Sequence, residues 1–339
     1  MRTLYCLKPE ELQKELGLSK PFQARIVYQN LVKGIDSFSK MTSLTKDERA
    51  RLEEVYPSAL SSRIEAVSES ESAVKLAIRL HDGAVIECVR LTDGEGRHTA
   101  CLSSQVGCAM GCAFCKTGTM GLTRDLEAGE IIEQLVHLLS LGERISHIVF
   151  MGMGEPLANF QEVARALTEL HSRDAFDISY RKITISTCGL VPGIRRLTEL
   201  DIPVKLAVSL VSADDETRSR IMKVNRAFPL SELKDALISF QRHQDKRITL
   251  EYCMLSGVNM DKESAEKLRK FTKGLDALVN LIPWNAIEEL DFRSPSKDEI
   301  RSFTDCLDRL GVNYTIRRSK GRNINGACGQ LASETVRRK

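Results

Sequence analysis

Hydrophobic and polar positions follow two different periods along the chain, and the change of period divides it into three parts. The first part holds three segments with apolar residues at helical spacing between charged ones, namely residues 8–17, 20–34 and 43–56. The second part alternates apolar and polar positions in short runs over residues 62–92, with Asp82-Gly83 as a typical hairpin turn. We therefore expect helices in residues 1–58 and a small antiparallel sheet in residues 59–95.

From residue 98 onward, short apolar runs alternate with longer segments of helical period. The runs typical of strands are HTACLSS, SHIVFMG, KITIST, VKLAVSLV, ITLEYCML, LVNLIP and VNYTIRR. The helical segments are EAGEIIEQLVHLLSLG, NFQEVARALTELHS, LVPGIRRLTEL, LSELKDALISFQRH, ESAEKLRKFTK and SKDEIRSFTDCLDRLG. Repeated strand–helix units predict an α/β domain over residues 96–339, with a parallel sheet that is a full or partial barrel or an open doubly wound sheet. Ligands bind at the carboxyl ends of the strands in such sheets.

The composition is that of an ordinary globular protein, with 42% hydrophobic and 28% charged residues in a chain of 339. We find no apolar stretch of about 18 residues, so no membrane span is expected. The first residues, MRTLYCLKPEELQKELGL, lack the basic and then apolar pattern of an export signal. We therefore expect a cytoplasmic protein.

The net charge of +3 is too small to indicate a nucleic-acid partner by itself. Local basic clusters are more suggestive, and they comprise Arg317, Arg318, Lys320 and Arg322 beside Cys328, followed by Arg337, Arg338 and Lys339. From charge alone, a solvated charged face is the favoured interpretation of these residues.

The ten cysteines are not expected to form a disulfide framework, because no export signal accompanies them. Scattered thiols in or near apolar runs are expected to behave as small buried hydrophobes; these are Cys6, Cys88, Cys188, Cys253 and Cys306. The remaining five need a chemical explanation. Cys101, Cys108, Cys112 and Cys115 crowd into one short segment, and Cys328 lies alone in a glycine-bearing tail.

Cys108, Cys112 and Cys115 offer three thiolates within one C-x3-C-x2-C segment, in which Gly107 and Gly111 let the backbone wrap closely around a metal centre. An iron–sulfur cube normally takes four cysteines, so three ligands leave one iron free to bind something else. Zinc is the alternative, and it would need a fourth ligand folded in from elsewhere. The spacing after a strand in an α/β chain resembles the radical-SAM signature, which implies that S-adenosylmethionine would chelate the open iron.

Five motifs carry a closer resemblance. CLSSQVGCAMGCAFCKTGTMGL, MGMGEPLAN, ITISTCGLVPGI, NLIPWN and GACGQL, in that order, resemble the RlmN/Cfr family of radical-SAM RNA methyltransferases. The likeness extends from about residue 10 to about residue 333. It implies a radical-SAM partial (β/α)6 barrel with a small β subdomain and an N-terminal helical accessory domain that contacts RNA.

The resemblance also implies a set of site residues. Cys108, Cys112 and Cys115 would bind a [4Fe-4S] cluster, and Gly154 and Glu155 would contact the amino end of S-adenosylmethionine. Further residues implied to line the cosubstrate site are Ser186, Ser209, Leu210, Val211 and Asn285. Without the family, Ser186 and Asn285 would be read as strand-end hydrogen-bonding or turn residues.

The family's chemistry assigns roles to three more residues. Cys328 would take a methyl group from one S-adenosylmethionine, and the radical generated from a second would remove hydrogen from that methyl. The resulting carbon radical would add to adenine, and Cys101 would release the product by forming a disulfide with Cys328. Glu87 resembles the carboxylate that manages the ring proton, although a glutamate on a strand surface is its plainer interpretation.

The resemblance predicts methylation of carbon 2 of an adenosine in 23S rRNA, with transfer RNA as a further substrate. The expected partners are this RNA, held in part by the basic residues around Cys328, and a reductant such as flavodoxin or ferredoxin. We expect a monomer. Alternatives are a Cfr-like enzyme acting on carbon 8, a radical-SAM enzyme acting on another RNA or a small molecule, and a non-methylating iron–sulfur protein that binds RNA.

The chain departs from the family's pattern around the expected pocket. Val211 replaces a histidine, Asn325 replaces an acidic residue, and residues 286–294 replace a stretch rich in proline and glycine. These departures concern the cosubstrate pocket and the substrate-facing loops, so the reaction type is better founded than the substrate.

Overall fold

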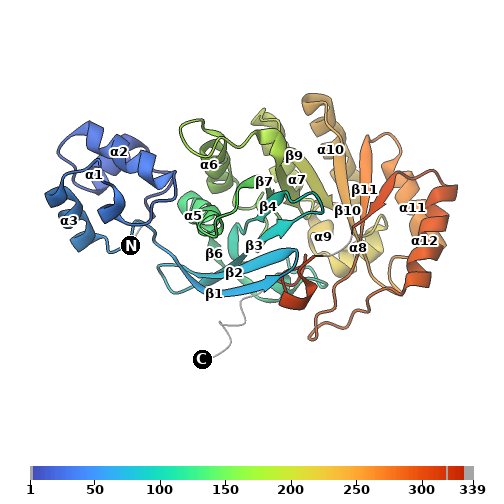
Figure 1. Cartoon of the computed structure of the whole chain (residues 1–339). Helices are drawn as coiled ribbons and strands as arrows, with labels where there is room; N and C mark the ends of the chain where they lie inside the picture. Colours follow the sequence, from blue (N-terminus) through green and yellow to red (C-terminus); the bar gives the residue numbers. More distant parts are fainter. Residues whose placement is uncertain (1–2, 318–319, 332–339) are drawn as a thin grey trace.

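The computed structural model describes residues 3–317 and 320–331, and these fold around one long sheet with a helical segment at one end (Figure 1). Some basic residues expected to contact RNA lie outside the described part, namely Arg318, Arg337, Arg338 and Lys339, as does the side chain of Arg322. Within the described part, no helix is long and apolar enough to cross a membrane.

The sheet contains ten strands in the order β1-β2-β3-β4-β7-β8-β9-β10-β11-β12 among the described residues. Their bounds are β1 (Arg63–Ser70), β2 (Ala73–Arg79), β3 (Val85–Thr92), β4 (His98–Cys101), β7 (Ile145–Phe150), β8 (Ile183–Thr187), β9 (Lys205–Ser209), β10 (Ile248–Met254), β11 (Ala277–Pro283) and β12 (Tyr314–Ile316). Every pair from β4 to β12 is parallel. The parallel strands follow one another in chain order without the reversal of a doubly wound sheet, and among the described residues β12 does not pair with β4. The predicted partial parallel barrel is therefore confirmed.

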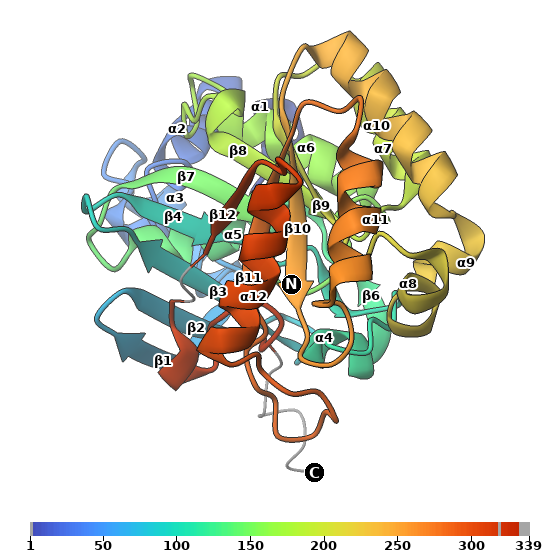
Figure 2. The same ribbon diagram turned by 90° about the vertical axis from the view of Figure 1, so that its right-hand side faces the viewer.

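Six helices connect the parallel strands, and all six were predicted from their helical period. They are α5 (Ala128–Leu139), α6 (Phe160–His171), α7 (Val191–Glu199), α10 (Leu230–Gln244), α11 (Lys262–Thr272) and α12 (Lys297–Arg309). Figure 2 shows α10, α11 and α12 covering the outer face of the last parallel strands. Short helical turns complete the barrel, namely α4 (Lys116–Thr119), α8 (Asp215–Ile221), α9 (Val224–Ala227), η2 (Tyr180–Lys182) and η3 (Arg322–Ile324).

Strands β1, β2 and β3 form an antiparallel extension of the barrel sheet rather than a separate layer. Strand β3 pairs with β4 so that Val89 lies opposite Cys101. The main hydrophobic core includes the fully buried Leu12, Ile78 and Ile148. A second, smaller cluster of buried residues includes Val211, Met222 and Leu255. The division into domains at residues 58 and 95 stays a prediction.

The N-terminal helices pack against the barrel through α5. These helical elements are α1 (Pro9–Glu15), α2 (Pro21–Leu31), η1 (Phe38–Lys40) and α3 (Lys46–Val55). Helix α5 lies between them and the sheet, so even its polar residues are buried (Figure 1). The carboxylate of Glu133 accepts hydrogen bonds from the hydroxyls of Thr3, at 2.7 Å, and Ser61, at 2.9 Å. Buried polar groups need such partners, and these bonds join the two parts.

A two-stranded sheet that the sequence analysis missed carries the cysteine motif. It consists of β5 (Gln105–Cys108) and β6 (Gly121–Asp125), which pair antiparallel. Gly107 has a φ of 79°, and a Cβ there would lie 1.9 Å from the carbonyl oxygen of Gly121, so the hairpin requires a glycine at this position. The hairpin closes the base of the loop that holds Cys112 and Cys115.

Candidate active site

The three motif cysteines line a cavity of about 180 Å³ at the carboxyl ends of the parallel strands. Most of the predicted site residues lie around the same cavity, namely Cys108, Cys112, Cys115, Gly154, Glu155, Ser186, Ser209, Val211, Asn285 and Cys328. They come from the ends of β5, β7, β8, β9 and β11 and from the C-terminal loop. The parallel topology therefore brings together residues that are far apart in the sequence.

The thiols of this trio are free and largely buried. Burial raises the pKa of Cys108 to about 11 and raises the pKa of Cys112 and Cys115 as well. Binding a metal centre must therefore displace protons from these thiols, because thiolates are the ligands.

The arrangement fits a cube better than a single ion. Within residues 3–317 and 320–331, no three His, Cys, Asp or Glu side chains converge closely enough to hold one metal ion. An iron–sulfur cube needs no such convergence, because each thiolate binds a different iron. Three free thiols around a shared cavity are the donor set that a cube with one open iron requires.

The loop that carries Cys112 and Cys115 is held by backbone contacts from three directions. Its Ala113 N–H donates to the carbonyl of Ile221 at 2.9 Å, and its Lys116 N–H donates to the carbonyl of Gly329 at 2.8 Å. The indole N–H of Trp284 donates to the carbonyl of Phe114 at 2.9 Å. These contacts fix the loop against α8, the C-terminal loop and the end of β11.

Gly154 and Glu155 lie where β7 ends, and both are tightly constrained. Gly154 has a φ of 99°, and a Cβ there would lie 2.6 Å from the Cβ of Gln105. The buried Glu155 carboxylate accepts the backbone N–H groups of Cys188, at 2.7 Å, and Leu157, at 3.1 Å. Burial raises the pKa of Glu155, whereas the bonds from Cys188 lower it. This carboxyl group is thus fixed at the wall of the cavity, where a cationic amino group would be a suitable partner.

Val211 lines the cavity in a strained backbone conformation. Its φ of 58° lies in the left-handed region, which β-branched residues rarely adopt. The side-chain amide of Asn259 donates to the Val211 carbonyl at 2.7 Å, and the Val211 N–H donates to the carbonyl of Glu251 at 3.3 Å. Such strain persists only where the surroundings impose it, and it gathers at functional sites.

Leu210 is the one predicted cosubstrate residue that does not line the cavity. Its side chain is buried in the main hydrophobic core, and its carbonyl accepts the Nε–H of Arg218 at 3.0 Å. The carbonyl of Leu210 thus binds Arg218, and its side chain belongs to the core.

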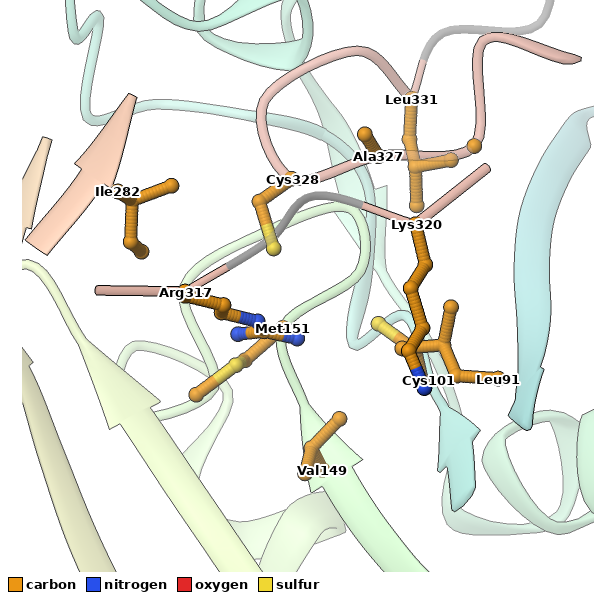
Figure 3. A pocket seen from close by; sticks show the side chains of 11 residues that line it. Leu91, Cys101, Val149, Met151, Ile282, Arg317, Lys320, Ala327, Cys328 and Leu331 are labelled. Carbon is orange, nitrogen blue, oxygen red and sulfur yellow. The ribbon is translucent and has the colours of Figure 1, made fainter. Parts of the chain in front are cut away.

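Cys101 and Cys328 line a second, smaller cavity of about 20 Å³. Figure 3 shows the Cys328 side chain entering it from the C-terminal loop, with Cys101 across from it at the end of β4. Neither thiol is in a disulfide. Burial raises the pKa of Cys101 to about 12. The cavity has room for about one water molecule.

The C-terminal loop is tied to three parts of the barrel. The Asn285 side chain donates to the Cys328 carbonyl at 3.2 Å, and the Thr117 hydroxyl donates to the Leu331 carbonyl at 2.5 Å. Lys75 on β2 donates to the carbonyl of Asn325 at 3.4 Å. These bonds hold Cys328 between the two cavities, and its side chain lines both.

Glu87 lies in the middle of β3 and is not among the residues that line either cavity. It forms an ion pair with Lys75 at 3.0 Å, and both side chains are largely buried. Strand alternation puts Glu87 on the same face as Val89, which lies opposite Cys101. The carboxylate is thus on the face of the sheet that carries Cys101, and its catalytic role stays a prediction.

Sequence reasoning did not assign to the main cavity the ionisable side chains of Cys188, Glu251, Cys253 and Arg317, which are among its lining residues. The two cysteines were expected to be no more than buried hydrophobes, yet both line the cavity. Arg317 lines both cavities, and the thiol of Cys328 raises its pKa, as does the carboxylate of Glu251. Cys188, Cys253 and Arg317 lie at or just beyond strand ends, which was the available signal, whereas Glu251 lies in the middle of β10.

Comparison with known proteins agrees with this geometry. Residues 102–268 match the Radical SAM superfamily. The probable dual-specificity RNA methyltransferase RlmN of Treponema denticola is 44% identical over 330 residues, which cover 97% of this chain and 95% of that protein. The dual-specificity RNA methyltransferase RlmN of Anaeromyxobacter dehalogenans is 44% identical over 326 residues, which cover 93% and 87%.

A solved structure resembles the whole chain. The radical SAM methyltransferase from Sphaerobacter thermophilus matches with a TM-score of 0.92 at 37% identity, over 98% of this chain and 100% of that one. Sequence and structure thus agree along the full length, and the radical-SAM motif lies within the matched region. The chain therefore belongs to the RlmN/Cfr family of radical-SAM RNA methyltransferases, which use a [4Fe-4S] cluster and S-adenosylmethionine, and it stands closer to RlmN than to Cfr.

Proposed function

We propose that this RNA methyltransferase methylates carbon 2 of an adenosine in 23S rRNA and also accepts transfer RNA. The observation that carries the proposal is the shared cavity of Cys101 and Cys328, next to the trio of free thiols. A binding protein needs neither thiol, whereas a methyl-cysteine route needs both. The relatives from Treponema denticola and Anaeromyxobacter dehalogenans are named as dual-specificity enzymes, which supports two classes of RNA substrate.

The main cavity would hold both cofactors. Cys108, Cys112 and Cys115 would bind the cluster, and Glu155 beside Gly154 would accept the amino group of S-adenosylmethionine. Residues proposed to line the remainder of the cosubstrate are Ser186, Ser209, Val211 and Asn285, with the backbone of Leu210 behind them. When bound, the cluster supplies the electron that cleaves S-adenosylmethionine. S-adenosylmethionine supplies both the methyl group and the radical that removes hydrogen from it.

Cys328 would carry the methyl group, and this role is supported by its side chain, which lines both the cosubstrate cavity and the smaller cavity. Cys101 would resolve the protein–RNA adduct by attacking the Cys328 sulfur as a thiolate. The S–S bond forms as the bond between that sulfur and the methyl-derived carbon breaks, and this carbon takes up a proton as the methylated base leaves. The raised pKa of Cys101 means that this attack is coupled to loss of the thiol proton. Glu87 would accept the proton from the adenine ring.

A purine cannot occupy a cavity that holds about one water molecule. The C-terminal loop must therefore move, or the cavity must widen, when the target base enters. The base itself has to be unstacked to reach this depth, which favours single-stranded or opened RNA. Arg317 and Lys320 bring positive charge to this region and would bind phosphates in a salt-dependent way.

Methylation of carbon 8 is the alternative within the family. Pro156 in the MGMGEP segment is commoner in the RlmN branch, which favours carbon 2. We further propose that flavodoxin or ferredoxin supplies the electrons and that the chain acts as a monomer.

Mass spectrometry of nucleosides tests the proposal. Ribosomal and transfer RNA are digested from cells with the gene, without it, and with a copy in which Cys328 is changed to Ala. The proposal predicts that 2-methyladenosine disappears from ribosomal RNA without the gene and does not return with Cys328→Ala. Unchanged 2-methyladenosine would contradict it, and loss of 8-methyladenosine instead would establish the alternative.

A further inference from the structure

Arg218 on α8 is a completely buried arginine, with 0% of its surface exposed. Its guanidinium donates to three backbone carbonyls, those of Leu210 at 3.0 Å, Cys188 at 2.6 Å and Ser209 at 3.3 Å. Its remaining acceptor is the side-chain oxygen of Asn225 at 2.8 Å. Among the described residues, no carboxylate forms an ion pair with it, so a full positive charge is buried among neutral acceptors.

Burying a charge in this way is unfavourable unless an opposite charge lies within reach. Burial lowers the pKa of Arg218, whereas the thiols of Cys188 and Cys112 and the carboxylate of Asp215 raise it. Asp215 is exposed, and its carboxylate already accepts hydrogen bonds from Asn225 and from the N–H of Leu230, both at 2.9 Å. An anionic partner for the buried charge would therefore lie on the side of Cys188 and Cys112.

The metal-binding loop lies on that side. The carbonyl of Ile221, at the end of α8, accepts the N–H of Ala113, which is next to Cys112. Cys188 and Ser209, whose carbonyls bind the guanidinium, line the cavity that the motif cysteines line. Arg218 thus stands directly behind the wall of the cluster site, shielded from solvent.

We propose that Arg218 is a positioning residue whose buried positive charge stabilises the reduced iron–sulfur cluster and so makes the cluster easier to reduce. A cube held by three thiolates carries net negative charge, and one more electron increases it. A fixed cation in a poorly solvated region favours that electron more than a solvated one would. Net charge is one of the factors that set the potential of such clusters. The proposal rests on the assigned cluster and deepens the proposed function by naming a residue that governs electron uptake.

Arg218 has a second task, which must be separated from the first. The hydrogen bonds of its guanidinium hold the ends of β8 and β9 in place, so a variant could disturb the pocket without any electrostatic effect. A substitution that keeps the charge and one that removes it distinguish the two. Arg218→Lys keeps a cation but loses the planar guanidinium with its several donors. Arg218→Gln keeps a polar side chain but loses the charge.

The test is a redox titration of anaerobically reconstituted full-length protein, followed by electron paramagnetic resonance. For Arg218→Gln we expect an equilibrium constant for reduction about tenfold smaller, equivalent to about 59 mV for one electron. Arg218→Lys should retain most of the wild-type potential. Arg220→Gln, which removes an exposed arginine of the same helix, is the matched control and should change nothing. An unchanged potential in Arg218→Gln, or equal losses in the Lys and Gln variants, would overturn the proposal.

A second variant covers the case in which Arg218→Gln does not fold or hold iron. The double exchange Asp215→Asn with Asn225→Asp keeps one hydrogen bond between these two side chains and moves the negative charge into contact with Arg218. It gives up the bond from Asn225 to the Asp215 carbonyl and the bond from the Leu230 N–H to the side chain of residue 215, so iron content is measured alongside the potential. The guanidinium keeps its acceptors, but its charge is neutralised, so the potential should again fall. An unchanged potential here also overturns the proposal. Neither measurement uses RNA, so failure of the proposed methylation would leave the test intact.

Discussion

Cys101 at the end of β4 and Cys328 in the C-terminal loop line one cavity of about 20 Å³ as free thiols. The first lies at the start of the parallel barrel and the second beyond its last strand. Hydrogen bonds from Asn285 and Thr117 hold the loop that carries Cys328 against the barrel. With the two thiols together, an adduct on Cys328 can be replaced by a disulfide between Cys328 and Cys101. The proposed methylation requires this step.

Replacing Cys101 by Ala should trap the RNA on Cys328. The variant keeps the methyl-carrying thiol but lacks the thiol that releases the product, so the adduct has no route to resolution. Incubation of the reconstituted variant with RNA and S-adenosylmethionine should give a protein band of slower mobility on a denaturing gel, sensitive to ribonuclease.

The matched control for this trap is Cys306→Ala, which removes a thiol on α12 outside both cavities. It should turn over without accumulating a covalent species. If the Cys101→Ala protein migrates only at the position of unmodified protein, under conditions in which wild type methylates RNA, the resolving role of Cys101 is contradicted.

Thr117 should restrain the C-terminal loop through its buried bond to the carbonyl of Leu331, at 2.5 Å. Thr117→Val removes this bond, worth about 1 kcal/mol, and should raise the rate at which iodoacetamide alkylates Cys328 about fivefold. Thr117→Ser keeps the hydroxyl and should behave as wild type. Thr119→Val, whose hydroxyl bonds only to the nearby Lys116 carbonyl, is the control. Equal alkylation rates in wild type and the three variants, at equal iron content, would show that the bond from Thr117 to Leu331 does not control access to Cys328.

Gly154→Ala should weaken binding of S-adenosylmethionine by at least about tenfold, a loss of about 1.4 kcal/mol. The new Cβ would meet Gln105 at 2.6 Å, and relief of that clash must displace the adjoining Glu155. Gly142→Ala is the control, because Gly142 has a φ of 88° but nothing within 4 Å of its Cβ position. Equilibrium dialysis with labelled S-adenosylmethionine measures the affinity. Similar affinities for the two variants would mean that the close approach at Gly154 is unimportant.

His137 should make the fold sensitive to mild acid. Burial lowers its pKa to about 4, from an ordinary 6.5, although Asp36 partly opposes this. Between these pH values the histidine is more protonated in the unfolded chain than in the folded one. The contribution of His137 to the free energy of unfolding is therefore present above pH 6.5 and is lost as the pH falls toward 4. Glu133 acts in the opposite sense, because burial raises its pKa. Comparison with a His137 variant is therefore needed to isolate the histidine.

Urea denaturation of wild type and His137→Gln, each at pH 7.5 and 5.5, makes that comparison. The expected result is that wild type loses about 1 kcal/mol more than the variant between the two pH values. An equal loss in the two proteins would place the acid sensitivity elsewhere.

The regular part of the fold could be predicted because its periods are strong. Each parallel strand is a short apolar run, and each long helix shows a clear apolar stripe over several turns. The hairpin of β5 and β6 was missed because the GLTRD run is short and mostly exposed. Its pairing depends on the close approach of Gly107 to Gly121, which no local pattern reveals.

The candidate site divides in the same way. Cys108, Cys112 and Cys115 could be found from spacing alone, whereas the link between Cys101 and Cys328 came only from the resemblance to a family. Arg317 and Arg218 could not be assigned, because a basic residue in the sequence looks the same whether it is solvated or buried. Only the fold places these two side chains beside the cavities.

The most direct test of the account is Mössbauer and electron paramagnetic resonance spectroscopy of anaerobically reconstituted protein, before and after addition of S-adenosylmethionine. The account predicts one [4Fe-4S] cluster per chain on Cys108, Cys112 and Cys115, with one iron whose signal changes when S-adenosylmethionine binds. A zinc-loaded protein, or a cluster whose spectrum S-adenosylmethionine leaves unaltered because every iron already has a side-chain ligand, would contradict it.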